Sequence, residues 1–132
     1  MRHVLLPLFL ACAAPVAADE TGHGRELYLQ HCAACHGTEA DGKGPMSQLL
    51  TIAVPDLNQL QASSEDDVYP MSRVVQTIDG RIALRGHGGP MLVYGQILGG
   101  GSAVVDLDSG GVLQTRGDIV SIAEYLDSVQ AK

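Results

Sequence analysis

The chain has 132 residues and a formal net charge of −7, because fifteen acidic residues outnumber eight Lys and Arg residues. This length suits a single domain, and the excess of negative charge disfavours nucleic acid as a partner. Three cysteines are too few for a disulfide framework.

The first eighteen residues have the pattern of a cleaved export signal. A polar start at Arg2 precedes a short apolar run, Val4–Ala14, and the small residues Val16–Ala18 offer a cleavage site before Asp19. The apolar run is too short to span a bilayer, and no later stretch of the sequence is long enough either. We therefore expect residues 1–18 to be removed and residues 19–132 to form one soluble domain in the periplasm, without a membrane-spanning segment.

Cys12 offers an alternative, because it could accept a lipid anchor after export. Phe9 suits the start of a lipid-attachment signal poorly, and a good conventional cleavage site follows it. We therefore prefer cleavage after residue 18. Cleavage removes Cys12 and Arg2, which makes the remaining chain one charge more negative and leaves Cys32 and Cys35 as its cysteines.

A helix is predicted directly before these cysteines. Thr21 can cap its start, and small, apolar or aromatic residues then recur at helical spacing. The recurring positions are Gly24, Leu27, Tyr28 and His31. The predicted helix runs straight into Cys32.

The stretch CAACH, Cys32 to His36, places two thiols three positions apart with a histidine directly after them. It could belong to a zinc site, a redox disulfide or a c-type haem site. Structural zinc needs four ligands, and the other cysteines and histidines lack the spacing to supply them. A redox pair should follow a strand, whereas a helix is predicted before Cys32. The haem hypothesis uses all five residues, because both thiols bind the vinyl groups and His36 becomes the proximal iron ligand.

A haem would also supply core material that the mature sequence lacks. Large aromatic rings usually dominate the interior of a domain of this size, but cleavage after residue 18 leaves four tyrosines and no Phe or Trp. These are Tyr28, Tyr69, Tyr94 and Tyr125. Because Cys32 and Cys35 share one face of a helical turn, they suit two vinyl groups of a flat ring. We therefore expect one haem c, bound covalently through two thioethers.

The next part of the chain is predicted to be mostly irregular. A loop rich in glycine and acid, Gly37–Pro45, leads to a short helix, Met46–Ile52, and Pro55 then ends it. Residues 62–67 form a polar linker. A clear helix begins after Pro70 and stops at Gly80. Its apolar positions are Met71, Val74, Val75 and Ile78.

The last part of the chain combines a glycine-rich loop, a small hairpin and a helix. Residues 81–101 are predicted to form the loop, and weak alternation over residues 103–115 predicts the hairpin around residues 108–111. Thr115 can cap the final helix. The final helix is expected to bury Ile119, Ile122, Ala123 and Leu126 and to expose Ser121, Glu124 and Ser128.

Over nearly all of residues 21–130 the chain resembles class I cytochrome c, and specifically the small bacterial monohaem members. Besides the CAACH stretch, Gly24 and Tyr28 match the glycine and the aromatic residue of the family's first helix. In the family these cross a C-terminal helix, at positions that correspond to Ile122 and Tyr125 here. The resemblance implies an all-α fold, the cytochrome c fold, with three to five helices wrapped around one covalently attached haem.

The resemblance also implies the distal iron ligand. Pro90-Met91, in a stretch rich in glycine, looks like the family's loop that delivers a methionine to the iron. His87 in the same loop is an alternative ligand, and Met71 and Met46 are weaker ones. The resemblance further suggests that a proline carbonyl orients His36, and both Pro45 and Pro55 are candidates.

The chain departs from the family pattern in two places. Tyr94 stands where many relatives have tryptophan, and residues 99–117 follow no family pattern.

Coordination by His36 and Met91 would fill both axial positions of the iron, so that only electrons can be exchanged. The sequence therefore favours a one-electron carrier, not an enzyme, acting as a monomer between exported or membrane-bound redox proteins. Two alternatives are a haem enzyme or sensor with a detachable distal ligand, and a fixed cytochrome subunit of a dehydrogenase or oxidase complex. Donor and acceptor are not specified by the sequence.

Lysines are too scarce for the lysine ring with which many members of the family dock. Without the signal segment the lysines are Lys43 and Lys132. We expect instead that small and apolar residues near Ala33, Ala34 and Leu92 frame the exposed haem edge, with charge giving only weak steering.

Overall fold

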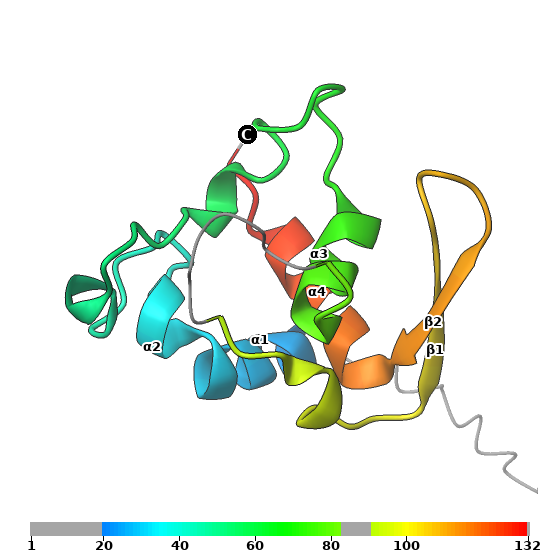
Figure 1. Ribbon diagram of the computed structural model, residues 1–132, viewed down its shortest axis with the longest axis horizontal. Coiled ribbons are helices and arrows are strands. Elements are labelled where there is room, and N and C mark those ends of the chain that lie inside the picture. Colours follow the sequence, from blue (N-terminus) through cyan, green and yellow to red (C-terminus); the bar gives the residue numbers. More distant parts are fainter. Residues whose placement is uncertain (1–19, 83–90, 132) are drawn as a thin grey trace, which may run out of the picture.

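The computed structural model describes residues 20–82 and 91–131 and is mostly helical (Figure 1). The α-helices of these residues are α1 (Glu20–His31), α2 (Ala33–His36), α3 (Met71–Asp79) and α4 (Gly117–Ser128). Short 3-10 helices span Ser47–Leu49, Leu57–Gln59 and Tyr94–Gln96. Strands β1 (Ser102–Asp106) and β2 (Val112–Arg116) form an antiparallel pair. None of the described helices is long and apolar enough to cross a membrane.

The first and last helices cross closely, as the resemblance implied. A Cβ atom on Gly24 would overlap the Ser121 carbonyl oxygen, and it would lie 2.6 Å from the carbonyl carbon of Ser121 and 3.0 Å from Cβ of Tyr125. The Tyr28 and Tyr125 rings flank this crossing with centroids 5.3 Å apart. Only glycine lets the two backbones come so near. Tyr125 is therefore placed as expected, while Ser121 is the residue whose backbone meets Gly24.

The core lies between α1, α3 and α4. The residues predicted to be buried on α4 are buried, and so are three of the four predicted on α3, whereas Met71 is half-buried at the edge of the core. Tyr69 connects the two helices, because its hydroxyl donates to the carbonyl oxygen of Ala123 at 2.8 Å. Burial raises the pKa of Tyr69 above that of an exposed phenol.

Two of the predicted caps are wrong, and so is one predicted surface residue. Helix α1 already begins at Glu20, so Thr21 lies inside its first turn. Thr115 pairs with Ala103 in the hairpin, and α4 starts after Arg116. Ser121 is only 5% exposed, because the close approach of Gly24 covers it.

The predicted limits of α3 are confirmed. Pro70 precedes the helix, and Gly80 ends it with φ of 82°, a left-handed conformation that suits glycine. Between residues 37 and 70 the chain is irregular apart from the short 3-10 helices. The helix expected over Met46–Ile52 is only one such turn, Ser47–Leu49, since Leu50 is already extended.

The hairpin corrects the all-α expectation while confirming the alternation from which it was predicted. Residues Val105 and Leu113 face each other across the strands, and the side of the hairpin that carries Leu113 packs on the core. Gly110 and Gly111 form the turn with φ of 85° and 88°, values that other residues adopt rarely. In Figure 1 the hairpin projects beside α3 and α4. The fold is therefore mainly helical with one small sheet.

Several predictions fall on residues 1–19, 83–90 and 132, which lie outside the described residues. These are the export signal of residues 1–18, the alternative anchor at Cys12, the alternative ligand His87, and Pro90. All four stay predictions.

Candidate functional site

A cavity of about 890 Å³ lies inside the helical part of the fold. This volume is in the upper part of the range of roughly 300–1,000 Å³ that is usual for small-molecule and cofactor sites. Its wall is mostly apolar and comes from the end of α1, from α2, α3 and α4, and from two connecting segments, residues 50–64 and 91–94. Cys32, Cys35, His36 and Met91 all lie on this wall. The structure thus brings together the four residues that the sequence predicted for one cofactor.

The two cysteines are presented by one helical turn. Helix α1 ends at His31, and the amides of Cys35 and His36 donate to the carbonyl oxygen of Cys32 at 3.1 and 3.0 Å. Cys32 itself stays connected to α1, because its amide donates to the carbonyl oxygen of Tyr28 at 2.8 Å. Burial raises the pKa of the Cys32 thiol to about 11. A thiol kept protonated is unlike the acidic, nucleophilic cysteine of a redox pair.

His36 lies half-buried on the cavity wall. Burial lowers its pKa, which favours the neutral imidazole that a metal requires. The nearby backbone of Pro55 acts in the opposite direction and raises the pKa of His36. Among the described groups, none makes a hydrogen bond of good geometry with the buried Nδ1 of His36. Pro55 lines the cavity together with His36. Of the two candidate prolines, Pro55 therefore lies on the cavity wall with His36, and Pro45 does not.

The backbone that follows His36 is held by a buried tyrosine. The hydroxyl of Tyr28 donates to the carbonyl oxygen of Gly37 at 2.7 Å. Tyr28 is fully buried at the crossing of α1 and α4. The packing of the two helices thereby fixes the position of the CAACH turn.

Met91 lies on the cavity wall, whereas Met46 and Met71 do not. Met46 is exposed, and Met71 packs against the core. Among the methionines of the described residues, Met91 alone therefore lies where it could contact the same bound cofactor as His36.

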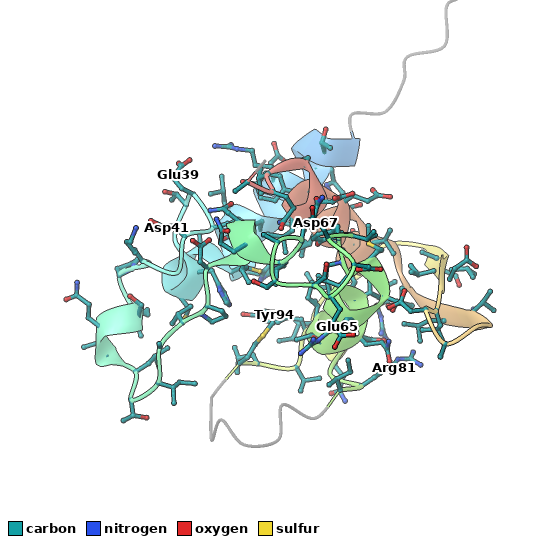
Figure 2. All side chains as sticks on the ribbon, turned by 90° about the horizontal axis from the view of Figure 1, so that it is seen from above. Glu39, Asp41, Glu65, Asp67, Arg81 and Tyr94 are labelled. Carbon is teal, nitrogen blue, oxygen red and sulfur yellow. The ribbon has the colours of Figure 1, made fainter. Side chains whose placement is uncertain are left out.

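Tyr94 anchors the segment that follows Met91. Its hydroxyl donates to the carbonyl oxygen of His31 at 2.7 Å, and its ring meets the His31 ring edge-on with centroids 6.0 Å apart. Figure 2 shows Tyr94 near the middle of the molecule, whereas Glu39 and Asp41 lie toward its periphery. From the sequence, Tyr94 was only a replacement for tryptophan. Its hydroxyl supplies a connection to the end of α1 that the sequence gave no reason to expect.

Sequence reasoning missed Arg73. This residue is exposed on α3 and lines the cavity, where no other described Lys or Arg is present. The signal was weak, because an arginine between apolar helix positions usually marks a solvated face. No group of three or more His, Cys, Asp and Glu residues that could hold a metal ion occurs in the described part of the chain.

Comparison with known families finds a match over most of the chain. The family model described as cytochrome c matches residues 22–130, a stretch that includes the CAACH turn, the cavity wall and the crossing of α1 with α4. No curated protein matches the chain.

Proposed function

Since the chain belongs to the cytochrome c family, we propose that it is a one-electron carrier with a single haem c whose iron is ligated by His36 and Met91. Members of this family bind haem c covalently, and they generally transfer electrons without being enzymes. The observation that supports the finer assignment is the cavity of about 890 Å³, whose wall carries Cys32, Cys35, His36 and Met91.

The residues of the cavity fit this cofactor. Cys32 and Cys35 lie on one turn, as two thioether bonds to one ring require. His36 has a lowered pKa and a buried nitrogen without a described hydrogen-bond partner. Arg73 supplies a cation on the wall for the propionate groups. When bound, haem supplies an iron that alternates between the ferric and ferrous states.

The protein would tune that iron through its ligands and its cavity. The soft thioether of Met91 and the mostly apolar wall both favour the ferrous state, which carries less charge. The potential should therefore be higher than that of a haem with two histidine ligands. If His36 and Met91 both held the iron, no position would be left for a substrate, and electron exchange would be the chemistry that the haem supplies.

The proposed partners are redox proteins that donate and accept single electrons. The export pattern of residues 1–18 supports a periplasmic location, and we propose that the protein acts there as a free monomer. Permanent docking in a dehydrogenase or oxidase complex would use the same haem chemistry.

The purified holoprotein should take up one electron reversibly per chain and bind carbon monoxide only slowly in the ferrous state. The reason is that carbon monoxide must wait for Met91 to leave the iron. A potentiometric titration, mass spectrometry for one haem per chain, and flash photolysis would measure these properties. Rapid and stoichiometric binding of carbon monoxide would contradict the carrier and favour an enzyme or sensor. Size-exclusion chromatography measures the size of the purified species. A free carrier should elute as a monomer, whereas a fixed subunit should elute together with its complex.

The surface beside the cavity suggests how partners dock. Leu92 is 61% exposed and Leu49 is 73% exposed. A backbone hydrogen bond of 2.9 Å joins Met46 to Ala34, so that these two residues lie side by side. Ala33 was expected on this surface, but it does not belong to it, because it is 7% exposed and packs into the core. The one described lysine, Lys43, is paired with Asp41 at 3.0 Å. We propose docking through these apolar residues.

Electron self-exchange between the ferrous and ferric protein should therefore rise only modestly with salt, by less than about threefold across the physiological range, since salt screens the repulsion of two acidic molecules. Nuclear magnetic resonance line broadening measures the rate. Leu92→Glu should slow the exchange, whereas Ile97→Glu, at a residue that is 58% exposed and not on the cavity wall, serves as the matched control. A steep fall in rate with salt would show attractive charge pairing and refute apolar docking.

A further inference from the structure

We propose that Asp79 and Arg81 are positioning residues for Met91, holding the segment that follows this methionine against the end of α3. The inference rests on the proposed ligation of the iron by Met91. It concerns the end of α3, the hairpin and residues 91–96, which we call the Met91 segment. Apart from Met91 itself, the cofactor assignment gives these parts no role.

Asp79 is the centre of a small network. Its side chain is only 7% exposed, and one carboxylate oxygen accepts a hydrogen bond from Nε of Arg81 at 2.6 Å. The same oxygen lies 3.4 Å from the hydroxyl of Thr115 in β2. A largely buried carboxylate is costly unless it is paired and hydrogen-bonded. Asp79 therefore favours the arrangement in which Arg81 and Thr115 stay close.

The Met91 segment packs on this centre. Gly95 is buried, and a Cβ atom added to it would overlap the Asp79 carboxylate and lie 2.5 Å from the carbonyl oxygen of Asp79. Val93 packs against Gly80, where an added Cβ would come within 2.9 Å of its Cγ2. Tyr94, between them, donates to the carbonyl oxygen of His31. Three consecutive residues are thus fastened, starting two positions after Met91.

Arg81 extends the network to the hairpin. One terminal nitrogen donates to the carbonyl oxygen of Gln114 at 2.8 Å while Nε binds Asp79. Figure 2 shows Arg81 on the hairpin side of the molecule, away from Glu39 and Asp41. The planar guanidinium holds both acceptors at once, which a lysine ammonium on a flexible stem does less well. The hairpin thereby supports the position of the Met91 segment.

Loss of this support should raise the population in which Met91 has left the iron. An added ligand binds only that population, so its apparent dissociation constant is the intrinsic constant divided by the fraction that is open. The hydrogen bonds that would be lost are those of Arg81, whose charged side chain is half-exposed. Their loss corresponds to about a tenfold change in the equilibrium between bound and detached Met91.

Imidazole titration of the ferric holoprotein measures the opening. Arg81→Gln should bind imidazole about tenfold more tightly than the wild type. Arg116→Gln is the matched control, because it removes the same charge from an exposed side chain of the same hairpin; it should bind imidazole as the wild type does. Equal affinity of both variants with the wild type would overturn the inference.

A second pair of variants tests the packing without changing charge. Gly95→Ala must push the segment away from the end of α3 and should also tighten imidazole binding. Gly101→Ala, where an added Cβ meets nothing within 4 Å, should not. An unchanged affinity in Gly95→Ala would contradict the role of this contact.

The wild type and Met91→Ala separate this inference from the proposed ligation. If the ferric wild type shows a sulfur-to-iron charge-transfer band that Met91→Ala lacks, the ligation holds, and the Arg81 and Gly95 variants test the inference alone. If the wild type lacks the band, the proposed ligation fails and the inference fails with it.

Discussion

Met91→Ala should abolish the sulfur-to-iron charge-transfer band of the oxidised protein, lower its reduction potential and open the ferrous iron to carbon monoxide. The loss of a soft thioether ligand stabilises the ferric state relative to the ferrous state. The potential should fall on the order of 0.1–0.2 V, a fraction of the roughly 0.8 V over which axial ligands tune haem iron. Absorbance spectroscopy, potentiometric titration and flash photolysis measure the three effects.

Met71→Leu is the control for this experiment. Met71 packs at the edge of the core and is not on the cavity wall, so its replacement by a residue of similar volume should leave the band, the potential and the carbon monoxide kinetics nearly unchanged. If Met91→Ala kept the band and His87→Ala or Met71→Leu removed it, the ligand assignment would be wrong. The carrier mechanism would then have to be rebuilt around the other residue.

Gly24→Ala should destabilise the holoprotein by about 3 kcal/mol, the upper part of the usual cost of overpacking a core. In an exposed helix the same change stabilises by about 1 kcal/mol, so even the sign of the effect is diagnostic. The added Cβ would overlap the Ser121 carbonyl oxygen and lie 2.6 Å from its carbon. Because backbone atoms cannot rotate away as a side chain does, α1 and α4 must separate.

Thermal unfolding followed by far-UV circular dichroism measures this effect. For a domain of this size the midpoint should fall by about 10–20 °C. Gly101→Ala, in open space, should change it little. A Gly24→Ala protein as stable as the wild type would show that the two helices do not cross as closely as described. The change should also disturb the CAACH turn, because Tyr28 at this crossing holds the carbonyl oxygen of Gly37.

Local patterns in the sequence determined several features correctly. The spacing of Cys32, Cys35 and His36 places them on one helical turn wherever that turn lies in the fold, because the geometry is contained in five residues. Pro70 and Gly80 define α3, since the first cannot continue a helix backwards and the second readily adopts the left-handed conformation that ends one. Alternation around Gly110-Gly111 likewise predicted the hairpin.

Tertiary contacts decided the features that the same patterns predicted wrongly. Thr115 has the residue type of a helix cap, but pairing with Ala103 makes it part of a strand. Ser121 is polar and yet buried, because Gly24 brings α1 onto its backbone. Ala33 would suit an exposed position, but it faces the core. In each case packing between segments distant in the sequence outweighs a weak local preference.

The sequence by itself determined the geometry of the proposed attachment site, because Cys32, Cys35 and His36, which we propose for covalent attachment and proximal ligation, are neighbours in the chain. Only the tertiary structure decided which described methionine shares a cavity with His36, since Met46, Met71 and Met91 carry the same thioether and differ in where the fold places them. It also decided that Asp79, Arg81 and Gln114 meet, across as many as thirty-five positions of the sequence. No periodicity encodes such a meeting, because it arises from how α3, the Met91 segment and the hairpin pack together.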